Sequence, residues 1–295
     1  MTRLSRKRQA LYDDSPVRVY GAMPIAMLPY PYRLGRVDEN SPTAAKNAEH
    51  YILDSGIGDD SVTTTDIIES ANYLEADVVV PKDVIGDPHA TADAVRELYD
   101  RRDELHDGVE TIILPLQIND TYSYSDVMAM MPPINDFECW YGVGGMKDSA
   151  AVVQIERTIR CREAIGLDEH LHAFGCGASM PWVRTIVRCP WLLDSLDLST
   201  PAQLSSRGMM LHGDCDKLDV TLPRGKKCTS LNTQLAQFSV MLLNWYYSGQ
   251  ADSRDLDYEI SDPKLETLCH QHELWYGHNK TDELTTRNTA VSRPQ

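Results

Sequence analysis

The chain has 295 residues, with 44 acidic and 28 basic side chains and a formal net charge of −16. A hydrophobic fraction of 42% and a charged fraction of 24% are typical of a folded soluble protein and exclude an intrinsically disordered chain. No segment has the roughly 20 apolar residues that a membrane-spanning helix needs, and the basic N-terminus lacks the apolar stretch of a secretory signal. We interpret the seven scattered cysteines as reduced thiols, and expect a cytoplasmic protein without membrane contact.

The acidic balance bears on nucleic-acid binding, because lysine and arginine usually neutralise the phosphates. Aspartate (29) outnumbers glutamate (15), and lysine (9) is scarcer than arginine (19), which is the composition we expect of a protein that works in concentrated salt. The Debye length there is about 3 Å at 1 M, so the net charge would not exclude a nucleic-acid partner. The alternative is an ordinary acidic protein.

Hydrophobic patterning predicts strands that alternate with helices along the chain. The predicted strands cover residues 17–21, 51–53, 76–81, 111–117, 139–145, 170–175 and 191–194. The predicted helices cover residues 65–74, 89–106, 124–131, 150–165, 181–189 and 231–247. The proline-rich segment 24–31 is expected to be a loop.

Most of the predicted strands are continuous apolar runs, which is typical of a parallel sheet covered on both faces. Polar residues or glycines repeatedly follow these runs, and in a (β/α)8 barrel the C-terminal ends of the strands form the active-site face. These residues are Asp54, Asp83, Gln117, Gly144, Gly145, Gly175 and Asp194. We therefore predict one (β/α)8 TIM-type barrel over residues 17–280, with a flexible N-terminus (1–16) and a flexible tail (281–295).

Asp54, Asp83 and Asp194 each follow an apolar run, directly or within a residue or two. Converging carboxylates raise one another's pKa, which separates a protonated acid from an ionised nucleophile or base. That pair suits displacement at an acetal-like carbon such as an N-glycosidic C1′. The alternative for any one of these residues is a helix N-cap or a turn.

Six short motifs at the predicted strand ends resemble the guanine transglycosylase family, whose members exchange guanine for a 7-deazaguanine in nucleic acid. The resemblance spans about residues 50 to 210 and follows the family's order. The motifs are Asp54-Ser-Gly, Val79-Val-Pro-Lys-Asp83, Leu116-Gln117, Tyr141-Gly-Val-Gly144-Gly145-Met, Phe174-Gly-Cys-Gly177 and Leu193-Asp194-Ser195. This family has a (β/α)8 fold, in agreement with the fold predicted above.

The resemblance implies roles for individual residues. Asp194 is expected to be the nucleophile that attacks C1′ and expels guanine, and Asp54 the general acid/base for the departing and incoming bases. Asp83 is expected to accept two hydrogen bonds from the guanine edge, which adenine cannot offer. The other substrate-binding residues are expected to be Gln117, Gly144, Gly145, Ser55 and Gly56.

Two departures from the family pattern bear on the substrate. Members that act on transfer RNA carry a Cys-x-Cys-x2-Cys plus His zinc site near the C-terminus, and that spacing is not found in this sequence. The family's Asp-Ser-Gly-Gly-Phe-Gln is here Asp54-Ser-Gly-Ile-Gly-Asp. Residues that folding could gather around a structural zinc ion are His212, Cys215, Cys228, Cys269, His270 and His272; the alternative is buried thiols and surface histidines.

These departures favour the compact DNA-acting branch of the family. We therefore expect an enzyme that replaces guanine with a 7-deazaguanine, such as 7-cyano-7-deazaguanine, in DNA through a covalent aspartyl intermediate. Its partners would be DNA and the free 7-deazaguanine base, with no required cofactor, and a homodimer is left open. The alternatives are the same chemistry on transfer RNA and a catalytically silent paralogue that binds nucleic acid.

Overall fold

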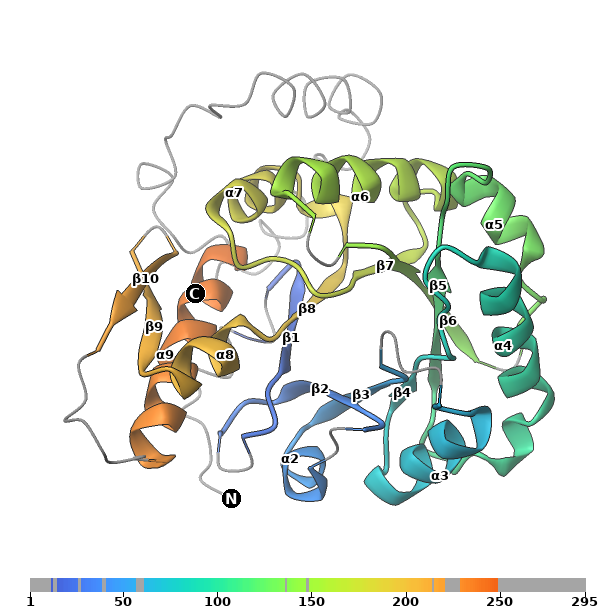
Figure 1. The fold of residues 1–295 in the computed structure, drawn as a ribbon. Helices are drawn as coiled ribbons and strands as arrows, with labels where there is room; N and C mark the ends of the chain where they lie inside the picture. Colours follow the sequence, from blue (N-terminus) through green and yellow to red (C-terminus); the bar gives the residue numbers. More distant parts are fainter. Residues whose placement is uncertain are drawn as a thin grey trace, which may run out of the picture.

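Eight parallel strands close into a barrel in chain order, with β8 paired to β1 (Figure 1). The strands are β1 (Arg18–Ala22), β2 (Tyr32–Arg36), β3 (His50–Asp54), β4 (Val78–Val79), β5 (Thr111–Leu116), β6 (Glu138–Val143), β7 (His170–Ala173) and β8 (Ser195–Leu198). The structure is a computed structural model that describes residues 12, 15–25, 28–38, 41–56, 61–135, 137–146, 149–213, 215–220 and 229–248. It confirms the predicted (β/α)8 fold.

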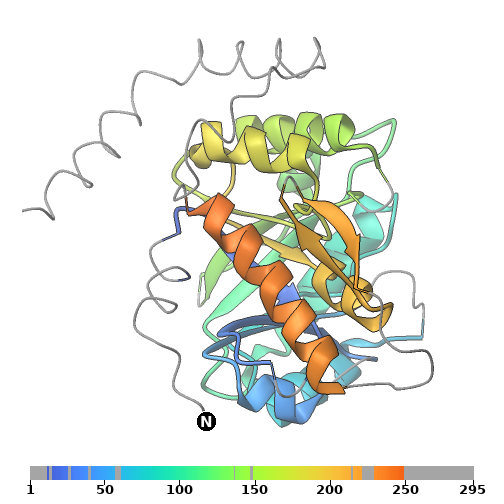
Figure 2. The same ribbon diagram turned by 90° about the vertical axis from the view of Figure 1, so that its left-hand side faces the viewer.

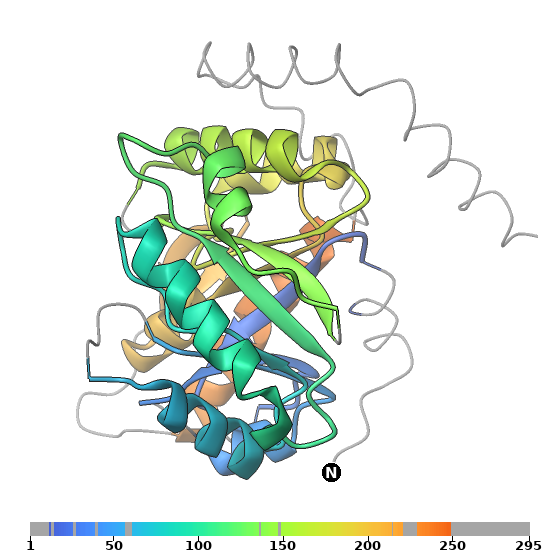
Figure 3. The same ribbon diagram turned by 90° about the vertical axis from the view of Figure 1, so that its right-hand side faces the viewer.

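Helices surround this barrel (Figure 1). They are α2 (Pro42–Lys46), α3 (Thr64–Leu74), α4 (Pro88–Asp100), α5 (Tyr124–Met130), α6 (Ala151–Ile165), α7 (Met180–Arg188), α8 (Thr200–Ser206) and α9 (Thr229–Tyr247), with 3₁₀ helices η1 (Arg102–Glu104) and η2 (Pro190–Leu192). An antiparallel hairpin of β9 (Met209–His212) and β10 (Asp216–Asp219) follows α8. Figure 3 shows α3 to α6 covering one side of the barrel.

Several elements differ from the sequence prediction. β2, α2, α8 and the β9–β10 hairpin were not predicted, and the predicted helix 89–106 ends as α4 at Asp100. The predicted strand 191–194 is wrong, because residues 190–192 form η2 and the eighth strand begins only at Ser195. The predicted flexible segment 281–295 and most of segment 1–16 lie outside the described residues.

The side of the barrel next to β1 is covered by α9 from the other end of the chain (Figure 2). Ala236 and Val240 of α9 pack in one apolar cluster with Tyr30, which lies just before β2. Asn244 Nδ2 donates to the Tyr30 hydroxyl over 3.0 Å. The buried Arg33 side chain donates to backbone carbonyl groups of the β1–β2 connection, Tyr30 at 3.2 Å and Ile25 at 3.0 Å. Side chains of Arg33 and of α9 therefore hold the β1–β2 connection in place.

The strands alternate between the barrel interior and the surrounding helices, as their two-residue period requires. Tyr20, Ile52, Val78, Ile113 and Trp140 form part of one interior cluster. The residues beside them, such as Val19, Leu53 and Val79, pack in the clusters beneath the helices. This alternation decides which polar residues of β7 and β8 reach the interior.

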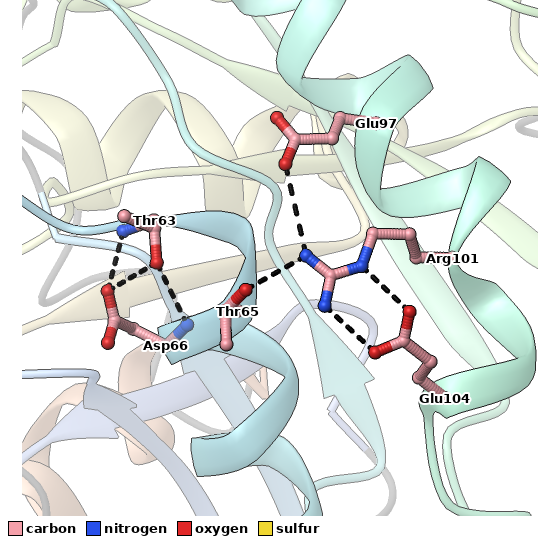
Figure 4. A network of polar contacts seen from close by, with 6 residues as sticks. All are labelled: Thr63, Thr65, Asp66, Glu97, Arg101 and Glu104. Atoms are coloured by element: carbon pink, nitrogen blue, oxygen red, sulfur yellow. Dashed lines mark hydrogen bonds and ion pairs between the residues drawn. The ribbon is translucent and has the colours of Figure 1, made fainter.

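Polar contacts also join neighbouring helices on the outside (Figure 4). Thr63 and Asp66 form a capping box at the start of α3, which satisfies backbone N–H groups there. Arg101, at the end of α4, donates to Thr65 Oγ1 over 3.0 Å and to Glu104 Oε1 over 2.8 Å. No helix among the described residues is long and apolar enough to cross a membrane.

Candidate active site

Three carboxylates gather at the C-terminal end of the barrel. Asp54 is the last residue of β3, Asp83 follows β4, and Asp197 is the third residue of β8. Asp54 and Asp197 line the same cavity, whose volume is about 270 Å³. Burial raises the pKa of Asp54 to about 7, the negative charges of Asp83 and Asp197 add to the rise, and the Gly56 N–H and Arg36 oppose it. Asp54 can therefore both donate and accept a proton near neutral pH.

Asp83 has one carboxylate oxygen occupied and one without a partner. Gln117 Nε2 donates to Asp83 Oδ2 over 2.7 Å, whereas Oδ1 is buried and accepts no hydrogen bond from the described residues. Burial raises the pKa of Asp83, and the hydrogen bond from Gln117 opposes that rise. A buried oxygen without a partner costs free energy, so this atom is suited to accept a donor from a ligand.

Gly144 allows Gln117 to lie where it does. A Cβ at position 144 would lie only 2.6 Å from the Gln117 side-chain amide, which is closer than non-bonded atoms approach. Gly145 has a φ of +67°, which favours glycine, and its carbonyl accepts from Arg157. The two glycines therefore have a packing role beside the Asp83–Gln117 pair.

The residues after Asp54 position its carboxylate. The Gly56 N–H donates to Asp54 Oδ1 over 3.3 Å, with Gly56 at a φ of +87°. Ser55 is fully buried, and its hydroxyl donates to the Pro81 carbonyl over 3.2 Å. Ser55 thus joins the end of β3 to the segment that carries Asp83, and the structure shows it in a supporting position, not lining the cavity.

Asp194 lies at the opposite, N-terminal end of the barrel. Its backbone N–H donates to Leu171 and its carbonyl accepts from Arg18, the first residue of β1. Its Oδ2 accepts from the buried Arg162 Nη2 over 2.6 Å and from the Leu171 N–H over 2.9 Å. It lines a different cavity, which it shares with His170. The prediction that Asp194 meets Asp54 and Asp83 is therefore wrong.

Asp197 occupies the position that sequence reasoning gave to Asp194. Asp194 precedes β8 at the N-terminal end of the barrel, whereas Asp197 lies inside the strand, two residues after Ser195 and on the same face. The signal was present in Ser195-Leu-Asp-Leu198, where Leu196 and Leu198 pack in the outer cluster and the polar residues alternate with them. Trp191 and Leu192 resembled the end of a strand but belong to η2.

The Asp197 side chain is held by groups from β7 and the turn after it. Gly175 N–H donates to its Oδ1 over 2.9 Å, and His172 Nε2 lies 3.4 Å from the same oxygen. Its Oδ2 accepts no hydrogen bond from the described residues, and the residue is 6% exposed. One oxygen of Asp197 is therefore anchored and the other is available at the cavity.

The proposed zinc ligands are only partly within the described residues. His212 ends β9 and Cys215 follows it, whereas Cys228, Cys269, His270 and His272 lie outside the described part of the chain. Within the described part, no group of three or more histidine, cysteine, aspartate or glutamate residues could hold a metal ion.

Comparison with known proteins adds no family assignment: no protein-family model matches the chain, and no curated protein matches it. A carboxyl with a pKa near 7 beside a second carboxylate provides an acid and a nucleophile in one cavity. Asp83 and Gln117 are not among the residues that line this cavity, but the charge of Asp83 contributes to the raised pKa of Asp54. Its buried Oδ1 can select among ligands by the donors that they present.

Proposed function

We propose that the protein is a base-exchange transglycosylase that replaces guanine with a 7-deazaguanine in DNA, through a covalent bond between Asp197 and C1′. The observation that carries this proposal is the position of Asp54, with its pKa of about 7, on the same cavity as Asp197. A retaining displacement at a glycosidic carbon needs such a pair, one carboxyl to protonate the leaving group and one to attack.

The exchange consists of two displacements. In the first, Asp197 Oδ2 bonds to C1′ as the bond from C1′ to N9 of guanine breaks, and Asp54 gives its proton to the departing base. In the second, Asp54 takes the N9 proton of the incoming 7-deazaguanine, whose nitrogen bonds to C1′ as the ester bond to Asp197 breaks. Each step exchanges one bond at C1′ for another, so neither needs an oxidant or a reductant.

Base selection fits the Asp83–Gln117 pair. Guanine presents two adjacent donors, N1–H and the exocyclic amine, whereas adenine offers no such pair on that edge. The Oδ1 atom of Asp83 lacks a partner among the described residues, and a base that fills this position with a donor removes the cost of the buried oxygen. A base without the donor leaves that cost in place, which gives selectivity.

DNA is the preferred nucleic acid because the sequence lacks the zinc-site spacing of the members that act on transfer RNA. To act on duplex DNA the enzyme must take the target nucleotide out of the stack, at a cost of a few kcal/mol. A mismatched or single-stranded target guanine should therefore react faster than a paired one.

The test is to incubate the full chain with a radiolabelled 7-deazaguanine base and either DNA or transfer RNA, at low and at molar salt. Label that appears in DNA supports the proposal. Label that appears only in RNA rejects the DNA assignment but keeps the chemistry. No label in either, with binding to nucleic acid retained, indicates the silent paralogue instead.

A further inference from the structure

A chain of polar side chains runs through the interior of the barrel and ends at Asp197. His170 Nε2 lies 2.8 Å from Ser195 Oγ, and Ser195 Oγ lies 2.9 Å from His172 Nδ1. His172 Nε2 in turn lies 3.4 Å from Asp197 Oδ1, but it is buried and makes no hydrogen bond to the described residues. Such a contact is often long in an enzyme without substrate and shortens in the reactive complex.

Strand geometry brings these four residues together. His170 and His172 are two apart on β7, and Ser195 and Asp197 are two apart on β8, so both pairs face the interior. The register places His172 opposite Ser195. Each pair lies within one strand, so the backbone that carries these four polar side chains belongs to the barrel itself.

Aromatic packing fixes the orientation of the two histidine rings. His172 is fully buried, with the edges or faces of Tyr20 and Phe174 at centroid distances of 5.9 and 4.8 Å. His170 stacks on Trp140 with ring centroids 3.7 Å apart. A ring held on several sides keeps its nitrogens aimed at fixed partners, which is the arrangement of residues that orient a reactive group.

The Asp197 carboxylate can only accept hydrogen bonds when it is ionised, and this sets the direction of the bonds that join His172, Ser195 and His170. Burial lowers the pKa of His170 to about 3, with Arg162, Arg18 and His172 adding to the decrease and Asp194 opposing it, so this ring has only one N–H to donate near neutral pH. The Asp197 carboxylate can accept only if His172 carries its N–H at Nε2, the ring atom that has no hydrogen-bond partner among the described residues. The Ser195 hydroxyl then donates to His172 Nδ1, and Ser195 Oγ accepts from His170 Nε2–H.

We propose that His172 is a positioning residue for the nucleophile: it holds Asp197 Oδ1 so that Oδ2 faces the sugar, with its tautomer set by Ser195 and His170. This inference rests on the proposed role of Asp197. Gly175 N–H already donates to Oδ1, and a hydrogen bond from His172 Nε2, which lies 3.4 Å away, would leave a single carboxylate oxygen to attack.

The kinetic test compares variants by the rate constant of covalent adduct formation with a guanine-containing oligonucleotide at saturation. His172→Phe keeps a buried ring without a donor, and should lower that rate about 10- to 100-fold with the KM for the oligonucleotide unchanged within about twofold. His172→Gln keeps a terminal N–H and should recover at least part of the lost rate.

His50→Phe is the control. His50 bonds the Tyr20 hydroxyl in the same interior over 3.0 Å but does not contact Asp197, so the rate of this variant should match the wild type. A Phe variant as fast as wild type, or a Gln variant no faster than Phe, overturns the proposal.

A second readout does not depend on catalysis. ¹⁵N NMR of histidine-labelled protein, with His172 assigned by the signals lost in His172→Gln, should show the Nε2–H tautomer for His172 and for His170. An Nδ1–H tautomer at His172 overturns the proposal even if the protein is an active transglycosylase. A wild-type protein that forms no adduct with DNA or transfer RNA overturns the proposed function and the kinetic role together, and the spectrum then decides only whether His172 donates to Asp197.

Discussion

Arg162 Nη2 lies 2.6 Å from Asp194 Oδ2 at the N-terminal end of the barrel. The guanidinium is 1% exposed and also donates to the carbonyl groups of Leu192, Gly166 and Glu169. It thereby joins the end of α6 to the turn before β8. Asp194 supplies the only side-chain oxygen among these partners, so its role here is to balance a buried positive charge.

Replacing Asp194 should therefore reduce stability. In Asp194→Asn the Arg162 guanidinium keeps its carbonyl partners but loses its counter-charge, and we expect a loss of about 1–3 kcal/mol in the free energy of unfolding. Urea unfolding at pH 7 measures it. Asp168→Asn, at a nearby exposed position, is the control and should stay within about 0.5 kcal/mol of wild type. Equal stability of the two variants would contradict the structural role.

Asp54 should make stability depend on pH. Its pKa in the folded protein is about 7, above the roughly 3.9 of an unfolded chain, so its ionisation costs stability above pH 7. That cost disappears as the pH falls from about 7 to about 4, because the folded state then binds a proton that the unfolded state does not.

Asp54→Asn should consequently be more stable than wild type at pH 8, by on the order of 2–4 kcal/mol. The difference should shrink at pH 6 and be nearly absent at pH 4. Urea unfolding of both proteins at the three pH values measures this, with the exposed Asp93→Asn as control. A difference that is the same at all three pH values would show that Asp54 does not have the raised pKa.

Asp83 should determine base selectivity. Asp83→Asn replaces one of the two acceptor oxygens with an NH2 group, which donates and cannot accept. The side chain can then no longer offer one oxygen to Gln117 and the other to the base. We expect the preference for a guanine over an adenine target to fall by roughly 10²-fold, with DNA affinity changed by less than about threefold. Competition between oligonucleotides that carry either base measures it. Unchanged selectivity would remove Asp83 from base reading.

The effects of substitutions at Gly144 and Gln117 on base exchange should not be additive. Gly144→Ala places a Cβ against the Gln117 amide and should move it off Asp83, raising the KM for the free base about tenfold. In a Gln117→Ala background there is no amide to displace, so Gly144→Ala should add little. The four-protein cycle of base-exchange rates measures the coupling. Additive effects of the two substitutions would show that the glycine acts independently of Gln117.

The sequence predicted the strands whose apolar runs were continuous, and their ends correctly placed Asp54, Asp83 and Gln117. It failed at β2, because its outward positions are Arg33 and Gly35, which give no apolar run. Arg33 is buried because carbonyls of the β1–β2 connection accept its hydrogen bonds, and an apolar pattern cannot show this.

The error at β8 has a different cause. Leu192 and Leu193 are buried in the turn before the strand, so hydrophobicity alone placed the strand too early. Asp197 in turn lies inside the short strand Ser195–Leu198, which begins after the predicted strand 191–194 ends. Its burial is explained by neighbours on β7 and the turn after it, His172 and Gly175, which are more than 20 residues away in sequence and meet it because β7 pairs with β8.

The proposed exchange requires that Asp197, and not Asp194, forms the covalent bond to C1′. Wild type, Asp197→Asn and Asp194→Asn should each be incubated with a guanine-containing DNA oligonucleotide, denatured, and the protein–DNA adduct quantified and mapped by mass spectrometry of peptides. We expect an adduct on Asp197 in wild type and in Asp194→Asn, and none in Asp197→Asn. An adduct on Asp194, or one that survives in Asp197→Asn, would contradict the proposed exchange.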